Sequence, residues 1–359
     1  YILAVKREED KLLAEFYTIG EEEKVLPDLA PRLRKDSQDL SEAVNKFISK
    51  IVVSRAVESG LNIGTLVAGY SRLADRSYIP YTGHVLVVGS TGTGKSTLMA
   101  KLMLETTSRI LVLDWVGNFT NLGFKVYRAD ELPLNPLVLG LRGLEILEEA
   151  SVYVYGERGE FSPIQWHILY NCSKESRNLV EVLECLESKA LNGGSDEKNA
   201  AMALLRRLIF LKHPAFQETG KLDVEKTVVD LSVFESSYQQ TVYALTLLNM
   251  VYEAYWGLTL FLDECHRVAK SSIVHKFLKE GRKRGFRLVL ATQNLTTLPK
   301  DVTNNCSVFI CFRLEDDMEV EKACKLLDPV NWRLLAGSVR GLNVGECFIR
   351  YLGSYYKPR

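Results

Sequence analysis

HVLVVGSTGTGKST, residues 84–97, is the stretch that decides how this chain folds. Its first part is a short apolar run that ends in Gly89, and its last part, from Lys95, opens a helical pattern. Between them lies the pattern G-x-x-x-x-G-K-[ST], in which a glycine-rich turn joins a buried strand to a helix. The stretch therefore predicts a phosphate-binding loop within a strand–loop–helix unit.

The residue types of this loop fit the triphosphate of ATP together with Mg²⁺. Glycines let the backbone curl so that its N–H groups point at phosphate oxygens, and the helix start adds the positive end of a dipole. We expect Lys95 to reach the β- and γ-phosphates and the Ser96 hydroxyl to ligate Mg²⁺. The predicted nucleotide-binding residues are Gly89, Thr91, Gly92, Thr93, Gly94, Lys95, Ser96 and Thr97.

Apolar runs alternate with helical patterns from residue 84 onward. Continuous apolar strands separated by helices indicate a mainly parallel sheet covered on both faces, and hence an α/β fold. Ligands of such sheets bind beyond the carboxyl ends of the strands. A long helical region is expected from about residue 162 to 216. The predicted strands are 85–89, 110–114, 227–232, 258–264, 287–293 and 307–312.

Two acids end the apolar run LTLFLDE, residues 258–264. A buried strand would deliver Asp263 to the magnesium side of the phosphates, where its carboxylate holds a metal-bound water. Glu264 would orient or deprotonate the attacking water. The alternative is a strand that merely ends at a polar surface, but an acid pair in a chain with a phosphate loop favours ATP hydrolysis.

Two other strands also end in polar residues. Gln293 closes RLVLATQ, residues 287–293, and would sense the γ-phosphate or position water; the alternative is a loop hydrogen bond. Asp114 closes RILVLD, residues 109–114. For Asp114, support of the metal shell and capping of the next segment are equally open.

A basic run lies between Lys270 and Arg287, with Glu280 as its one acid. Such a run is ordinarily a solvated helix face. Two functions compete with that interpretation: lining of a DNA channel, or an arginine finger that enters the ATP site of a neighbouring subunit. The candidates for the finger are Arg282 and Arg284.

Bulk composition is that of an ordinary globular protein. Lys+Arg and Asp+Glu both number 45, so the formal net charge is zero, which argues against a generally basic nucleic-acid binder. The seven cysteines form no Cys-x-x-Cys pair, and we expect reduced core thiols in an intracellular, cytoplasmic protein. No apolar run reaches about 18 residues, so no membrane span is expected.

Several segments together resemble the HerA/FtsK superfamily, and the archaeal HerA branch in particular. They span roughly residues 60–352, and the last segment is the most telling, because a phosphate loop alone does not separate ATPase families. They are NIGTLV (62–67), GHVLVVGSTGTGKST (83–97), LVLDWVGNF (111–119), TVVDLS (227–232), LFLDECHR (260–267) and EGRKRGFRLVLATQNLTTLPKDVTNNCSVFICFRL (280–314).

The resemblance implies a RecA-like core, a homohexameric ring and ATP-driven movement of double-stranded DNA through its pore. It also implies a nuclease partner similar to NurA. The family's polar sensor falls on Gln293 and its trans-acting arginine on Arg282. On this basis residues 61–359 form the ATPase domain, with a helical insertion at about 140–220, and residues 1–60 form a small N-terminal region of strands plus a helix.

Two departures from the family pattern stand out. Asn118 replaces a Glu that the family places after the strand at 110–114. The N-terminal β-barrel of the family is not evident in residues 1–60, where 36–57 carry helical spacing. A partner would bind at the N-terminal region, so its departure from the family pattern leaves the identity of the partner open.

Three functions therefore compete. The first is a ring motor that translocates or unwinds double-stranded DNA. The alternative is an ATPase that powers a conjugation, secretion or viral packaging machine, with the same core and another partner. The third is a non-motor kinase or nucleotide switch, which lacks an evident acceptor pocket and lid.

Overall fold

An eight-stranded sheet, in the order β12-β11-β5-β10-β9-β6-β8-β7, forms the centre of the computed structural model, which describes residues 2–8, 11–17, 61–68, 71–79, 83–330 and 332–351. The neighbours β10–β9, β9–β6, β6–β8 and β8–β7 run parallel, and β11–β12 run antiparallel. This confirms the predicted α/β fold with a mainly parallel sheet. The strands are β5 (His84–Val88), β6 (Arg109–Asp114), β7 (Lys125–Arg128), β8 (Lys226–Asp230), β9 (Leu258–Leu262), β10 (Arg287–Thr292), β11 (Cys306–Phe312) and β12 (Cys347–Tyr351).

The middle strands are buried along their whole length. Every residue of β5, β9 and β10 is buried, and so is every residue of β6 after Arg109. Their side chains are almost all branched or aliphatic, as expected for strands covered on both faces. The strands β7 and β12, which the sequence did not predict, are short and carry more exposed or half-exposed residues.

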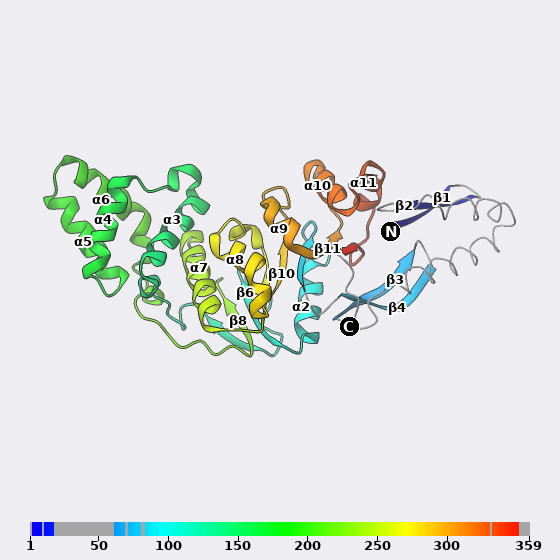
Figure 1. The fold of residues 1–359 in the computed structure, drawn as a ribbon, viewed down its shortest axis with the longest axis horizontal. Helices are drawn as coiled ribbons and strands as arrows, with labels where there is room; N and C mark the ends of the chain where they lie inside the picture. The colour runs from blue at the N-terminus through cyan, green and yellow to red at the C-terminus, as the bar shows by residue number, and fades with distance from the viewer. Residues whose placement is uncertain are drawn as a thin grey trace. The chain divides into compact units, whose positions relative to one another are not determined.

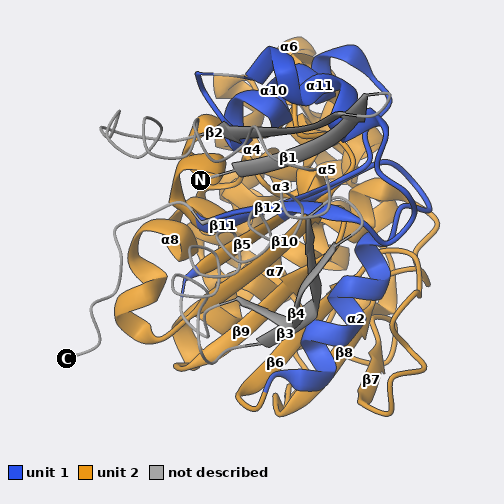
Figure 2. Cartoon of the chain, turned by 90° about the vertical axis from the view of Figure 1, so that its right-hand side faces the viewer, with its two compact units in different colours: residues 1–83, 87–106, 307–359 blue, residues 84–86, 107–306 orange. Residues whose placement is uncertain are grey.

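Contacts divide the chain into two compact units, coloured in Figure 2. Unit 1 comprises residues 1–83, 87–106 and 307–359, and unit 2 comprises residues 84–86 and 107–306. The helices of unit 1 are α2 (Lys95–Glu105), α10 (Asp317–Leu327) and α11 (Trp332–Arg340). Those of unit 2 are α3 (Leu141–Tyr155), α4 (Pro163–Glu175), α5 (Leu179–Asn192), α6 (Ser195–Leu208), α7 (Ser237–Ala254), α8 (Ser272–Glu280) and α9 (Lys300–Asn305).

Within unit 2, the helices α4, α5 and α6 pack against one another, and α3 packs against α7 (Figure 1). The long helical region expected at 162–216 is thus broken into separate helices. The break between α4 and α5 falls at Ser176–Asn178, where Asn178 accepts a hydrogen bond from Glu181 N and caps α5.

A disulfide joins Cys172 of α4 to Cys185 of α5, so the expectation that all cysteines are reduced is wrong for this pair. The spacing of 13 residues places the two thiols on facing helices, which sequence reasoning had no means to foresee. The cysteines 265, 306, 311 and 324 are free and buried, as expected of core thiols.

The N-terminal part of unit 1 contains two antiparallel hairpins. The first joins β1 (Ile2–Glu8) to β2 (Lys11–Tyr17), and the second joins β3 (Leu61–Ala68) to β4 (Ser71–Ile79). Strands are therefore present in residues 1–60, while the helix expected at 36–57 lies outside the described residues. Among the described helices, none combines the length and apolar character that a membrane crossing requires.

Replacement by Ala at two glycines inside helices should change the free energy of unfolding in opposite directions. A Cβ on Gly143 of α3 would lie 2.0 Å from the Pro136 carbonyl oxygen, whereas a Cβ on Gly337 of α11 would meet nothing within 4 Å. We expect Gly143→Ala to lower the free energy of unfolding by about 1–3 kcal/mol, because the backbone must move. Gly337→Ala, the matched control, should raise it by about 0.5–1 kcal/mol. Urea denaturation checks both, and equal effects would contradict the close approach at Gly143.

Candidate nucleotide-binding and hydrolysis site

The loop between β5 and α2 has the backbone that a phosphate cradle needs. Gly92 and Gly94 adopt φ values of 74° and 118°, a region that side chains rarely tolerate. Gly89 has no room for a side chain, because a Cβ there would lie 2.6 Å from Phe312 Cβ and 2.8 Å from Thr93 Oγ1. At Gly94 a Cβ would lie 3.1 Å from Phe312 Cε1. Packing against β11 therefore fixes two glycines of the motif.

Polar contacts hold the loop in its curled shape. Thr93 Oγ1 and Lys95 Nζ both donate to the Ser90 carbonyl, at 2.8 and 2.9 Å. Ser90 N donates to the Arg313 carbonyl, and Gly345 N donates to the Thr93 carbonyl. Lys95 is only 6% exposed, so its ammonium lies inside the loop and not in bulk solvent.

The start of α2 suits an anion and a magnesium ion. Gly94 is the N-cap, and no side chain caps the helix, so its first N–H groups face the cradle without a competing side-chain oxygen. Ser96 is half-buried in the first turn, and Thr97 beside it is exposed. A hydroxyl and a loop of backbone amides are the donors by which P-loops hold a Mg²⁺–triphosphate, so these residues fit the predicted ligand.

The acid pair follows β9 directly. Asp263 is 4% exposed, and its Oδ1 accepts a hydrogen bond of 3.0 Å from Glu264 N. Glu264 has φ 43°, and among the described residues it is the one non-glycine with a positive φ. Such a backbone turns the chain sharply after the strand and is often found at functional sites.

Gln293 and Glu264 follow neighbouring strands of the sheet, and the structure brings the two side chains together. Gln293 Nε2 donates to Glu264 Oε1 at 2.7 Å. His266, which the sequence analysis did not single out, lies 3.2 Å from Glu264 Oε2 through Nδ1. The same Nδ1 lies 3.2 Å from Thr292 Oγ1. The sequence pointed toward His266 only through the motif-like string DECHR. The contact between His266 and Thr292 could not be foreseen, because it depends on how β10 packs beside the turn.

Cys265, between Glu264 and His266, takes no part in polar chemistry. Burial, with smaller contributions from Cys306, Glu264 and Asp263, raises the pKa of the Cys265 thiol well above its ordinary value. The thiol therefore stays neutral and packs in the core.

Asp114 acts as a cap. Its carboxylate accepts hydrogen bonds from the backbone N–H groups of Val116, Gly117 and Phe119, at 3.2, 2.9 and 2.7 Å. The side chain is fully buried. Of the two roles that the sequence left open, the structure supports capping of the loop after β6.

Several side chains of the basic run form ion pairs or ring contacts with residues of the same unit. Lys276 pairs with Glu253 at 3.3 Å and Lys279 with Asp301 at 2.7 Å. The Arg284 guanidinium lies over the rings of Tyr252 and Trp256, at 4.6 Å from each centroid. Arg284 is thereby held within its own subunit and is the weaker candidate for a finger.

Arg282 and Lys283 are exposed on the turn after α8. Arg282 donates from Nη2 to the Asn305 carbonyl at 2.8 Å. Its exposure distinguishes it from Arg284, which is packed against aromatic rings. The assignment of Arg282 as the trans-acting residue stays a prediction.

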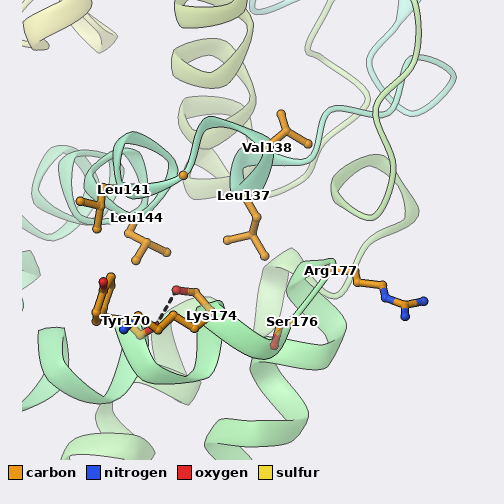
Figure 3. A pocket seen from close by; sticks show the side chains of 10 residues that line it. Leu137, Val138, Leu141, Leu144, Tyr170, Lys174, Ser176 and Arg177 are labelled. Carbon is orange, nitrogen blue, oxygen red and sulfur yellow. Dashed lines mark hydrogen bonds between the residues drawn. The ribbon is translucent and has the colours of Figure 1, made fainter.

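A hollow of about 250 Å³ lies elsewhere in unit 2, lined by residues between 137 and 177 (Figure 3). It has an apolar floor, and Lys174 Nζ lies 4.5 Å from the centroid of the Tyr170 ring at its edge. None of the predicted ATP-site residues lines it. The lining residues are Leu137, Val138, Gly140, Leu141, Leu144, Tyr170, Ser173, Lys174, Ser176 and Arg177.

A mainly parallel sheet with a glycine-rich phosphate loop between a buried strand and a helix is characteristic of P-loop ATPases, and this protein is one of them. Two family models narrow the class. "Helicase HerA, central domain" matches residues 80–251, and "TraM recognition site of TraD and TraG" matches residues 257–327. These two matches confirm the resemblance to the HerA/FtsK superfamily that the sequence segments indicated.

Two solved structures of one protein, TrwB, show the same fold. The bacterial conjugative coupling protein TrwB, without its first 70 residues, is 14% identical, with a TM-score of 0.57 over 86% of this chain and 89% of that one. TrwB bound to a non-hydrolysable GTP analogue is 16% identical, with the same coverage and TM-score. The packaging NTPase B204 of Sulfolobus turreted icosahedral virus 2 is 12% identical, with a TM-score of 0.39 over 76% and 94% of the chains. No curated protein matches.

Asp114 and Asp230 end adjacent strands and allow a matched test of capping. Asp230 accepts one backbone hydrogen bond, from Ser232 N at 2.9 Å, against three for Asp114. We expect Asp114→Ala to lower the free energy of unfolding by roughly 3–5 kcal/mol and Asp230→Ala by about 1–2 kcal/mol, because buried N–H groups lose their acceptor. Chemical denaturation measures both. Loss of ATP binding by Asp114→Ala at unchanged stability would instead indicate a metal-shell role.

Proposed function

We propose that the protein is an ATP-driven motor for double-stranded DNA, of the kind that powers a conjugation, secretion or packaging machine. The observation that carries the proposal is the succession of two family matches along one fold, a HerA central domain followed by a TraD/TraG segment. The likeness to a conjugative coupling protein over most of both chains supports the same choice. The motor would work in the cytoplasm, where its fuel is found.

In this proposal the loop residues 89–97 bind ATP, with Lys95 on the β- and γ-phosphates. Ser96 and Asp263 would hold Mg²⁺, which would offset the negative charge of the phosphates. Glu264 orients the attacking water and accepts its proton, and Gln293 fixes the Glu264 carboxylate or senses the γ-phosphate. Arg282 serves the neighbouring site of a homohexamer.

A HerA-like translocase with a nuclease partner is the second candidate. The central-domain match over residues 80–251 favours it. The cores of the two motors are alike, so the partner separates them. An affinity purification that recovers a NurA-like nuclease would support the HerA-like function, whereas recovery of membrane channel components would support the conjugation function.

ATP turnover tests the catalytic assignment. We expect duplex DNA to stimulate hydrolysis, with a stimulation that weakens as salt rises, because phosphate contacts release counterions. Glu264→Gln should bind ATP but lose turnover by about 10²–10⁴-fold, the range of a general base. Lys95→Ala should lose ATP binding itself. A steady-state ATPase assay with a nucleotide-binding measurement checks all three, and turnover indifferent to DNA would contradict the motor.

Mixed rings test Arg282. Arg282→Ala should reduce turnover roughly 10³-fold or more if its guanidinium completes a neighbouring site. Mixing it with Glu264→Gln protein should restore part of the activity, since some interfaces then hold both intact residues. Lys283→Ala, at the next exposed position, is the matched control and should keep its activity. No restoration in mixed rings would remove Arg282 from the trans role.

A further inference from the structure

We infer that His266 is a positioning residue that, together with Thr292, holds the Glu264 carboxylate in its working orientation. The inference rests on the proposed role of Glu264 in ATP hydrolysis. Its basis is the pair of 3.2 Å distances from His266 Nδ1 to Glu264 Oε2 and to Thr292 Oγ1.

The chemistry of these partners decides which ring nitrogen carries the proton. A carboxylate only accepts hydrogen bonds, so an unprotonated Nδ1 facing Glu264 at 3.2 Å would set two lone pairs against each other. Nδ1–H avoids this and reaches both Glu264 and the hydroxyl of Thr292. Thr292 Oγ1 in turn accepts from Asn294 N at 3.0 Å, which fixes the hydroxyl oxygen. The imidazole is thus oriented by a side chain that is itself fixed.

The turn that carries His266 is anchored on both sides of it. Cys265 is buried, and Arg267 Nη1 donates to Gln240 Oε1 at 3.0 Å. Gln240 Nε2 donates in turn to the Leu231 carbonyl at 3.0 Å. The Arg267 guanidinium also lies 5.3 Å from the Trp115 ring centroid. His266 therefore has little freedom to leave Glu264 by movement of its own backbone.

Two contacts then tie the acid to the end of β10. Gln293 Nε2 donates to Glu264 Oε1 at 2.7 Å. His266 Nδ1, which also contacts Thr292, lies 3.2 Å from Glu264 Oε2. Adjacent residues of one strand end thus control both oxygens of the carboxylate. A carboxylate gripped on both oxygens keeps one rotamer, and misplacement by about 1 Å costs about 10²-fold in rate.

Paired substitutions separate donation from bulk. The amide nitrogen of Asn occupies nearly the place of Nδ1, so His266→Asn keeps the donor, while His266→Leu keeps volume and removes it. We expect His266→Leu to lower kcat by about 10–100-fold with KM for ATP changed less than about 3-fold. His266→Asn should stay within about 5-fold of the wild type. Thr292→Val should fall between them.

The control is His275, a half-exposed histidine whose Nδ1 lies 3.6 Å from Asp301 Oδ2 on the surface. His275→Leu and His275→Asn should leave kcat unchanged. Thermal unfolding of each variant checks that the fold is kept. Because the proposed action passes through Glu264, adding His266→Leu to Glu264→Gln should not lower the residual rate further.

The outcomes distinguish the two proposals. Wild-type turnover that survives in Glu264→Gln would overturn the role of Glu264 and, with it, the positioning role. Loss of turnover in Glu264→Gln with full activity in His266→Leu overturns the positioning role alone. Equal losses in His266→Asn and His266→Leu would also overturn it, since a lost donor would not then be the cause.

Discussion

Burial of the central strands on both faces is the constraint on which the site depends. In β6, β8, β9 and β10 the interior positions are apolar or hydroxyl-bearing, because an unpaired charge there would cost far more than the strand contributes. Charged side chains are found only at the ends of these strands. Asp114, Asp230 and Asp263 all stand at such positions, yet each is engaged in a different way.

These differences distinguish an aspartate that stabilises a loop from the acids of the proposed hydrolysis site. The Asp114 carboxylate accepts hydrogen bonds from backbone N–H groups of the following loop, so its negative charge stabilises the fold. Asp263 accepts a hydrogen bond from Glu264 N, and Glu264 turns out of the strand with a positive φ. The hydrogen bond from Gln293 and the contact with His266 then orient the Glu264 side chain. A positive φ and a carboxylate fixed by neighbouring side chains fit the role of general base that we propose for Glu264.

The phosphate loop requires glycine for two different reasons. Its glycines are dictated partly by φ and partly by space, since Gly89 abuts Phe312 and Thr93, while nothing crowds Gly92. The basic run shows how composition misleads: Lys276 and Lys279 are neutralised by nearby acids, and Arg284 is packed against aromatic rings. A positive stretch in the sequence is therefore not a positive surface of equal strength.

The sequence alone predicted six of the eight strands of the sheet, the cradle and the acid pair, because apolar runs, glycine spacing and strand-terminal acids are local patterns with local causes. The edge strands β7 and β12 are short and partly polar, so no such pattern marks them. The sequence left open whether Asp114 caps a loop or serves a metal, since hydrogen-bond partners are set by the path of the chain after β6. It passed over His266 and the Cys172–Cys185 pair for the same reason. Only tertiary structure decides such contacts, because they join residues from separate elements whose approach depends on how those elements pack.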